Sequence, residues 1–303
     1  MNEKNQPFNI LSIDGGGIRG VYAAHILSKI EKDLQIDLSE SINLIAGTST
    51  GSIIAAAVAL KIPMSDIVKL YSEHGGKIFS RKWFSSQAYN SIYKGSNLRG
   101  VLLDVFGNVR LGEINKPLLI PASNIGNGGV HVFKSAYDPG FYRDKDVKVA
   151  DAVLASCSAP TYFDPHKVDE YLLSDGGLWA NNPTLVAIID AKKRLNIDLD
   201  DMKILSVGTG HAKKEYGVEQ KKMWGMLSGW GVTDFISYIL SMQSESAQNM
   251  SGLLLEPDQI LRLNFETDAP IALDDPKIIG DMLSKAGREF TYKSAEIKAF
   301  LQG

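Results

Sequence analysis

Hydrophobic and polar positions along the chain follow two alternating periods. Short runs rich in β-branched residues predict strands at 8–13, 42–46, 117–122, 130–134, 171–174 and 203–207. Between them, apolar residues recur at steps of three and four, as on one face of a helix. The clearest such set is Val21, Ala24, Leu27, Ile30 and Leu34. Strands that alternate with helices predict an α/β fold in three layers, with a mostly parallel central sheet covered by helices on both faces.

The same pattern continues to the last residues without a clear break. Residues 259–265 predict an edge strand, and 275–302 predict an amphipathic helix. We find no internal repeat, low-complexity segment or linker. The sequence therefore predicts a single domain over 1–303, with the motif-bearing core at 8–210 and a helical C-terminal part at 211–303.

A serine between two glycines stands where a predicted strand meets a predicted helix. The five residues Gly47-Thr48-Ser49-Thr50-Gly51 follow the strand at 42–46 and precede the apolar run 53–60. A G-x-S-x-G turn in this context is typical of a nucleophile elbow, because side chains in place of Gly47 and Gly51 would collide with the strand and the helix. The helix N-terminus also favours negative charge near Ser49. The turn predicts a hydrolase that attacks a carbonyl carbon through Ser49.

A glycine cluster follows the first predicted strand. In Asp14-Gly15-Gly16-Gly17-Ile18-Arg19-Gly20, consecutive glycines allow several backbone N–H groups to face one point. Gly15, Gly16 and Gly17 are therefore candidates for an oxyanion hole. We expect Arg19 to hold this loop or to meet a substrate phosphate.

The glycine spacing also satisfies the dinucleotide-binding pattern G-x-G-x-x-G. That interpretation requires an acidic residue about 20 positions on, at the end of a second strand. Here residues 21–34 predict a helix, and the next strand ends in the serine elbow. The sequence therefore disfavours a nucleotide-binding fold.

Two residues compete for the role of the base that deprotonates Ser49. A Ser–His–Asp triad would use His211, which follows the predicted strand at 203–207. The alternative is Asp175, in a sharp Ser-Asp-Gly-Gly turn after another strand. A carboxyl group with its reference pKa of about 3.9 is a weak base for a hydroxyl, but burial in a dry cleft would raise that pKa. Asp175 could also be a turn residue that bonds only its own backbone.

Composition and charge narrow the classes of protein. The net charge of −3 does not favour a nucleic-acid polymer as partner, and the single cysteine, Cys157, allows no internal disulfide. The histidines are scattered without metal-ligand spacing, so we expect no metal. The N-terminal residues do not resemble a signal peptide, and no apolar run approaches the roughly 20 residues that span a membrane. We expect a cytoplasmic protein that meets a membrane only peripherally.

These blocks together resemble the patatin-like phospholipases, over roughly residues 8–210. The matching blocks are Asp14 to Gly20, Gly47 to Gly51, Ala155 to Phe163, and Asp175-Gly-Gly177 continuing to Thr184. The family consists of lipid acyl hydrolases with a Ser–Asp dyad and no cofactor. The resemblance implies Ser49 as nucleophile, Asp175 as proton acceptor, Gly15 to Gly17 as oxyanion hole and a phospholipid membrane surface as substrate.

The resemblance also raises hypotheses about regulation. Some bacterial members are membrane-degrading effectors in antiviral defence that a cyclic nucleotide activates, so a cyclic dinucleotide is a candidate activator. The aromatic and basic stretch at 75–100 predicts either a lid at the membrane or an ordinary covering layer. The apolar stripe within 221–250 predicts core or a contact in a homo-oligomer. The alternative to an enzyme is a regulator that binds a lipid or a nucleotide and has no catalytic activity.

Overall fold

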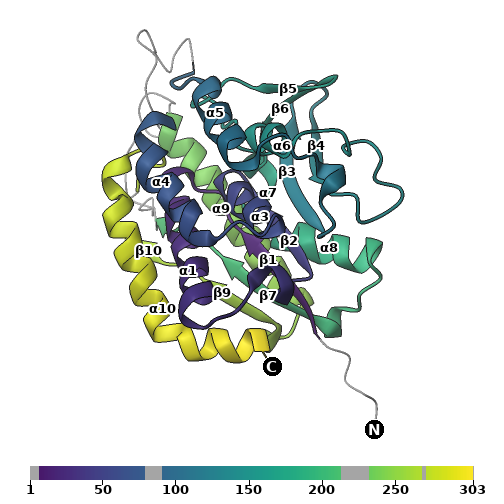
Figure 1. The fold of residues 1–303 in the computed structure, drawn as a ribbon, viewed down its shortest axis with the longest axis vertical. Coiled ribbons are helices and arrows are strands. Elements are labelled where there is room, and N and C mark those ends of the chain that lie inside the picture. The colour runs from purple at the N-terminus through teal and green to yellow at the C-terminus, as the bar shows by residue number, and fades with distance from the viewer. Residues whose placement is uncertain (1–6, 79–90, 213–231, 268–270, 303) are drawn as a thin grey trace, which may run out of the picture.

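The structure is a computed structural model that describes residues 7–78, 91–212, 232–267 and 271–302. Its main sheet has the strand order β5-β6-β3-β2-β1-β7-β9, with β4 paired to the other edge of β3 (Figure 1). The strands are β1 (Phe8–Ile13), β2 (Leu44–Gly47), β3 (Leu118–Asn124), β4 (Gly129–Lys134), β5 (His166–Val168), β6 (Tyr171–Asp175), β7 (Met202–Val207) and β9 (Ile260–Leu263). A separate pair consists of β8 (His211–Ala212) and β10 (Glu266–Thr267).

Helices cover both faces of this sheet, as the sequence predicted. They are α1 (Gly20–Asp33), α2 (Leu38–Ser41), α3 (Thr50–Ala59), α4 (Met64–Ile78), α5 (Gly95–Phe106), α6 (Val149–Ser156), α7 (Gly177–Ala180), α8 (Thr184–Arg194), α9 (Val232–Leu254) and α10 (Ile279–Gln302). In Figure 1, α1, α3, α4, α5, α6 and α10 lie in front of the sheet, and α8 and α9 lie behind it. The three-layer α/β fold is confirmed.

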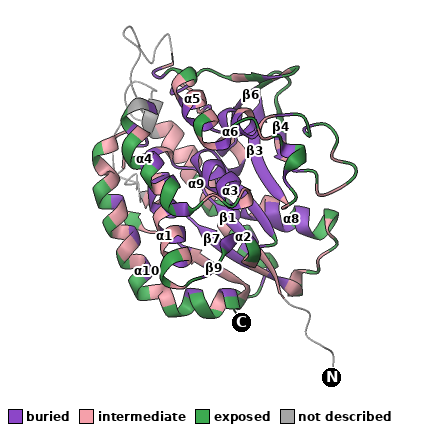
Figure 2. Ribbon diagram, viewed as in Figure 1, coloured by how far each residue is buried: buried purple, intermediate pink, exposed green. Residues whose placement is uncertain are grey.

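The alternation of side chains along β1 divides the core in two. Leu11 and Ile13 point to one face and join the large cluster built with the front helices. Ile10 points to the other face and packs in a second cluster with Ala187 and Ile188 of α8. Both sets are fully or almost fully buried, because successive strand residues face opposite sides of a sheet that is covered twice (Figure 2).

Part of the sheet is antiparallel, which the alternation of elements did not predict. Strands β1, β2, β3, β7 and β9 are parallel, whereas β4 and β6 run antiparallel to β3. Residues 125–128 join β3 to β4, and residues 169–170 join β5 to β6. Such short connections can only turn the chain back, whereas a parallel pair needs a crossover of a dozen residues or more.

The register along β3 brings two distant strand ends together. Leu119 pairs with Ala46 of β2 on one edge and with β4 on the other, and Ala122 pairs with Asp175 of β6 and again with β4. Because β4 occupies one edge throughout, β2 and β6 share the opposite edge and run toward each other. Their carboxyl ends therefore meet beside the middle of β3.

The remaining predictions have mixed outcomes. The strand at 259–265 is β9, at the edge of the sheet, and the C-terminal helix is α10. Helix α5 was not predicted, and α9 accounts for the helical part of 221–250. Residues 79–90 and 213–231, which hold part of the predicted lid and part of the apolar stripe, lie outside the described residues.

Candidate active site

Ser49 stands at the apex of the turn between β2 and α3, as the elbow motif predicts. Its φ of 52° and ψ of −129° belong to a region that non-glycine residues rarely adopt. Both flanking glycines are required by close packing. A Cβ on Gly47 would lie 2.3 Å from the carbonyl oxygen of Gly51, and one on Gly51 would lie 2.5 Å from that of Ile13.

Two serine hydroxyls hold the backbone of Ser49 in this conformation. The Ser156 hydroxyl accepts a hydrogen bond from the Ser49 N–H at 2.9 Å and donates to the Pro121 carbonyl at 2.6 Å. The Ser52 hydroxyl donates to the Ser49 carbonyl at 2.5 Å. These fully buried contacts link the elbow to α6 and β3 and offset the unfavourable backbone conformation. No sequence pattern indicated a role for Ser52 or Ser156.

Asp175 meets Ser49 directly. The Ser49 hydroxyl donates to Asp175 Oδ2 at 2.7 Å, and the Gly177 N–H donates to Asp175 Oδ1 at 2.6 Å. Asp175 is the last residue of β6, so the meeting of β2 and β6 beside β3 produces this contact. Burial raises the pKa of Asp175 to about 6, although the hydrogen bonds from Ser49 and Gly177 lower it in part.

The glycine loop lies beside the elbow but does not present all of its N–H groups to the site. The Gly15 N–H donates to the backbone carbonyl of Asn181 at 3.0 Å. The N–H groups of Gly16 and Gly17 donate to no acceptor in the described residues, and both glycines line the same pocket as Ser49. A Cβ on Gly17, whose φ is +59°, would lie 2.1 Å from the Leu273 carbonyl oxygen.

Two arginines hold the loop in place. Arg19 donates to the carbonyls of Gly16 and Gly210, at 3.2 and 3.4 Å, and burial lowers its pKa to about 10. Of the two roles expected for Arg19, these contacts correspond to loop support. Arg262 of β9 forms a bidentate ion pair with Asp14, with Nη1 at 2.8 Å from Oδ1. Sequence reasoning missed Arg262, although an arginine between two leucines of a predicted strand is a usable signal.

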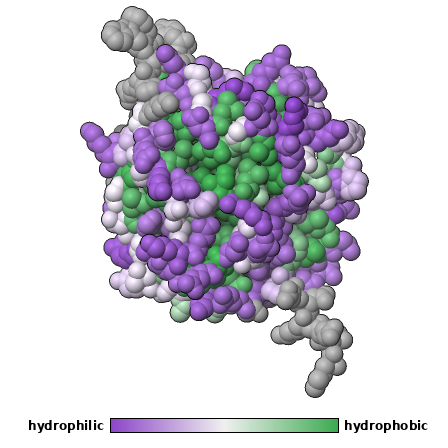
Figure 3. Space-filling model, in the orientation of Figure 1, coloured by the Kyte–Doolittle hydropathy of each residue, from purple (hydrophilic) through white to green (hydrophobic). Residues whose placement is uncertain are grey.

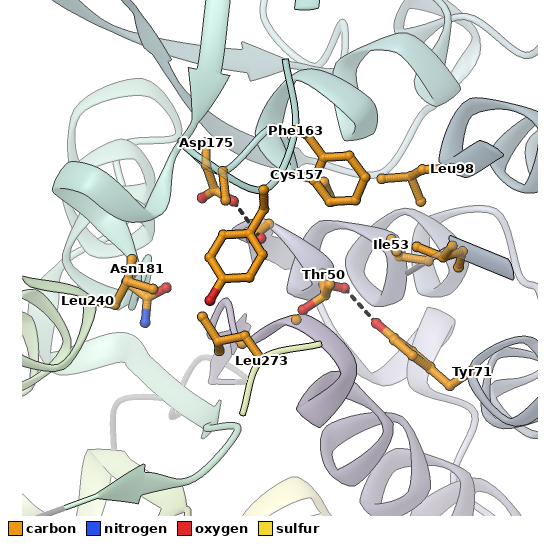
Figure 4. Close-up of a pocket in the computed structure, with 16 residues that line it drawn as sticks. Thr50, Ile53, Tyr71, Leu98, Cys157, Phe163, Asp175, Asn181, Leu240 and Leu273 are labelled. Atoms are coloured by element: carbon orange, nitrogen blue, oxygen red, sulfur yellow. Dashed lines mark hydrogen bonds between the residues drawn. The ribbon is translucent and has the colours of Figure 1, made fainter. Parts of the chain in front are cut away.

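A pocket extends from Ser49 and Asp175 and holds about 620 Å³ of space between atoms, its open mouth included. Figure 4 shows Asp175 and Asn181 on one side, and Ile53, Leu98 and Phe163 on the other. The pocket thus has a polar end at the Ser–Asp pair and an apolar end. Cys157 is buried and also lines the pocket, and burial raises the pKa of its thiol.

His211 occupies a different place. It belongs to β8, where its N–H donates to the Phe265 carbonyl, and it does not line the pocket. No hydrogen bond or ion pair among the described residues joins it to Ser49 or Asp175. The described part of the chain also holds no cluster of three or more His, Cys, Asp or Glu side chains suited to a metal ion. Among the same residues, no helix combines the length and apolar character needed to cross a bilayer.

Comparison with known proteins identifies the family. A family model described as patatin-like phospholipase matches residues 11–188, which span most of the elements that build the site. The chain belongs to the patatin-like phospholipase family. This membership makes it an enzyme, a carboxylic ester hydrolase of the lipid acyl hydrolase class.

Patatin relatives occur in plants and bacteria. Patatin-like protein 1 of Arabidopsis thaliana is 31% identical, over 93% of this chain and 79% of its own length. A cUMP-AMP-activated phospholipase of Escherichia coli is 29% identical, over 96% of this chain and 93% of its own. Among solved structures, VipD from Legionella pneumophila matches with a TM-score of 0.46 and 12% identity, over 95% of this chain and 67% of that one.

Proposed function

We propose that this patatin-like protein hydrolyses fatty-acyl ester bonds of glycerophospholipids with Ser49 and Asp175 as its catalytic dyad. The observation that carries the proposal is the 2.7 Å hydrogen bond from the Ser49 hydroxyl to Asp175 Oδ2, at the polar end of a largely apolar pocket. A nucleophile within hydrogen-bond distance of its base is the arrangement that acyl transfer requires.

In the acylation step, Ser49 Oγ attacks the carbonyl carbon of the ester while Asp175 takes the hydroxyl proton. The Gly177 N–H on Asp175 Oδ1 orients the carboxylate, so that Oδ2 faces Ser49. A pKa of about 6 makes Asp175 a stronger base than an ordinary carboxylate while it remains largely ionised at neutral pH. The environment of Asp175 thereby supports direct proton transfer without a histidine.

The negative charge that develops on the carbonyl oxygen requires hydrogen-bond donors. We assign this role to the N–H groups of Gly16 and Gly17, because both line the pocket and neither has an acceptor in the described residues. Gly15, an expected member of the oxyanion hole, instead uses its N–H to tie the loop to Asn181. Donors already fixed in position stabilise an oxyanion without reorganisation during the reaction.

The alcohol of the lipid leaves with the proton from Asp175, and the fatty-acyl group remains on Ser49. A water molecule, activated by Asp175, then releases the fatty acid. The apolar end of the pocket, near Ile53, Leu98 and Phe163, would hold the acyl chain (Figure 4). Figure 3 shows hydrophobic residues in the middle of the face that is viewed in Figure 1, and this area supports peripheral contact with a membrane.

We further propose that a cyclic dinucleotide activates the enzyme and that it serves as a membrane-degrading effector in antiviral defence. The similarity to a phospholipase named as cUMP-AMP-activated, over nearly the whole length of both chains, supports this proposal. Assembly into a homo-oligomer is part of the same hypothesis. Calorimetric titration and fatty-acid release, each with and without cUMP-AMP and cGAMP, test it. Unchanged release together with no heat of binding would refute it.

Fatty-acid release from phospholipid vesicles tests the dyad. We expect Ser49→Ala and Asp175→Asn to lose activity and His211→Ala to retain most of it, with circular dichroism to verify that each variant folds. An active Asp175→Asn enzyme would refute the dyad. A folded but inactive His211→Ala enzyme would favour the Ser–His–Asp alternative. Absence of turnover on every ester, with no labelling of Ser49 by a fluorophosphonate, would favour a silent regulator.

A further inference from the structure

The side chain of Asn181 carries a buried oxygen that no described residue satisfies. Asn181 follows α7 and is only 6% exposed. Its Nδ2 donates to the Ser244 hydroxyl at 2.9 Å, and its backbone carbonyl accepts the Gly15 N–H. Its Oδ1 accepts no hydrogen bond within the described part of the chain, although it is shielded from solvent. Such an acceptor is costly to bury, so its presence in the pocket points to a ligand with a hydrogen-bond donor.

Two glycines locate this oxygen beside the dyad. An ideal Cβ on Gly15 would lie 2.5 Å from Asn181 Oδ1 and 3.0 Å from Ser49 Cβ. An ideal Cβ on Gly177 would lie 3.0 Å from Asn181 Oδ1 and 3.0 Å from Asp175 Oδ1. The amide oxygen is thus near both Ser49 and the carboxylate, and Figure 4 shows Asn181 on the same side of the pocket as Asp175. The two distances from Gly177 place Asn181 Oδ1 no more than 6.0 Å from Asp175 Oδ1. A single water molecule can bridge two acceptors up to about 5.5 Å apart.

Hydrolysis of an acyl-enzyme makes a specific demand on the attacking water. The water must aim a lone pair at the carbonyl carbon while both of its O–H bonds point elsewhere. Asp175 accepts one O–H as the base. A second acceptor is needed to fix the direction of the other O–H, and no proton has to move to it.

We infer that Asn181 Oδ1 is this second acceptor and that it orients the water that releases the fatty acid from Ser49. This inference rests on the proposed acyl-enzyme at Ser49. The water oxygen bonds to the acyl carbon, and one water proton passes to Asp175. As the bond between the acyl carbon and Ser49 Oγ breaks, that proton passes to Oγ. The other water proton stays on the carboxylic acid that leaves, and Asn181 neither gains nor loses a proton.

Thr50 provides the matched control. Its Oγ1 is also buried, lines the same pocket and has no partner among the described residues. However, a Cβ on Gly20 would lie 3.1 Å from this oxygen and 2.6 Å from the Tyr71 hydroxyl, so it belongs to the part of the pocket next to Tyr71. Thr50→Val removes one buried oxygen from the pocket but leaves Asn181 Oδ1, the acceptor that we assign to the water, unchanged.

The experiment separates the two half-reactions with 4-nitrophenyl butyrate in rapid-mixing assays. The burst of nitrophenol reports the acylation rate, and we expect this rate in Asn181→Leu to stay within about threefold of wild type. We expect its steady-state rate, which deacylation limits, to fall about 10- to 100-fold. Mass spectrometry during turnover should then find butyryl-Ser49 accumulated in Asn181→Leu. Thr50→Val should keep the ratio of burst rate to steady-state rate of the wild type.

A second variant guards against a general folding defect. Asn181→Asp keeps an acceptor oxygen in the same place, so at the alkaline plateau of its pH profile it should deacylate faster than Asn181→Leu. Equal loss of acylation and deacylation in Asn181→Leu, or no loss of either, would overturn the role of Asn181. If wild type forms no butyryl-Ser49 and Ser49→Ala still turns over, the proposed acyl-enzyme itself is wrong, which is a distinct outcome.

Discussion

The buried carboxylate of Asp175 should reduce the stability of the protein at neutral pH. The pKa of an ordinary, solvent-exposed aspartate is 3.8, whereas the pKa of Asp175 in the folded protein is about 6, because burial disfavours the charged carboxylate. A raised pKa contributes stability that is complete below pH 3.8 and is lost as pH rises through 6. The full loss is about 3 kcal/mol, of which about half has occurred at pH 5. Asp175→Asn, which stays neutral, avoids this loss.

Urea unfolding of wild type and Asp175→Asn at pH 5 and pH 8 measures the effect. We expect the free energy of unfolding of Asp175→Asn, relative to wild type, to increase by about 1.5 kcal/mol between these two pH values. Ser49→Ala is the control, because it changes the other member of the proposed dyad but keeps the carboxyl group. Its pH dependence should be at least as steep as that of wild type. A difference between Asp175→Asn and wild type that is the same at both pH values would refute the reasoning.

Three further predictions concern rate and architecture. Because the pKa of Asp175 is about 6, only about a tenth of its carboxyl groups are ionised at pH 5, so kcat/KM for a soluble ester at pH 5 should be about tenfold below the value on its neutral-pH plateau. An equal kcat/KM at both pH values would exclude a base of this pKa. Arg262→Met leaves Asp14 buried without its ion-pair partner and should lower the free energy of unfolding, measured in urea, by about 3–5 kcal/mol. The double variant Arg262→Met with Asp14→Asn should recover part of this loss, and strictly additive losses would contradict the coupling. Gly51→Ala places a Cβ 2.5 Å from a β1 carbonyl oxygen and should lower esterase activity at least about 100-fold. Gly100→Ala, whose Cβ has no atom within 4 Å, should keep its activity, and equal activities of the two variants would disprove the packing argument.

Local sequence patterns were sufficient for the parts of the site that lie on single turns. The elbow at Ser49 follows from glycine spacing and apolar flanks, and Asp175 was expected at the end of a strand. The antiparallel direction of β6 was not predicted, because strand pairing depends on contacts far apart in the sequence and leaves no local periodicity.

The same limit explains the other omissions. Arg262 lies 248 residues from Asp14. That Asn181 Oδ1 has no partner among the described residues depends on how its neighbours pair in three dimensions. Asn181 lies within the block that resembles the acid motif, but nothing in the sequence indicated a role for its side chain. Conversely, Gly15 was expected to donate to the oxyanion, and only its hydrogen bond to the Asn181 carbonyl distinguishes it from Gly16 and Gly17.

The wide sequence separation of the site's components has a consequence for a chain still under synthesis. Ser49 precedes Asp175 by 126 residues, and the loop that lies beside it is held by Arg262, later still. A nascent chain that has exposed the elbow therefore lacks both Asp175 and the ion pair until β6 and then β9 have joined the sheet. Under the proposed mechanism, ester hydrolysis therefore begins only when the folding of the chain is nearly complete.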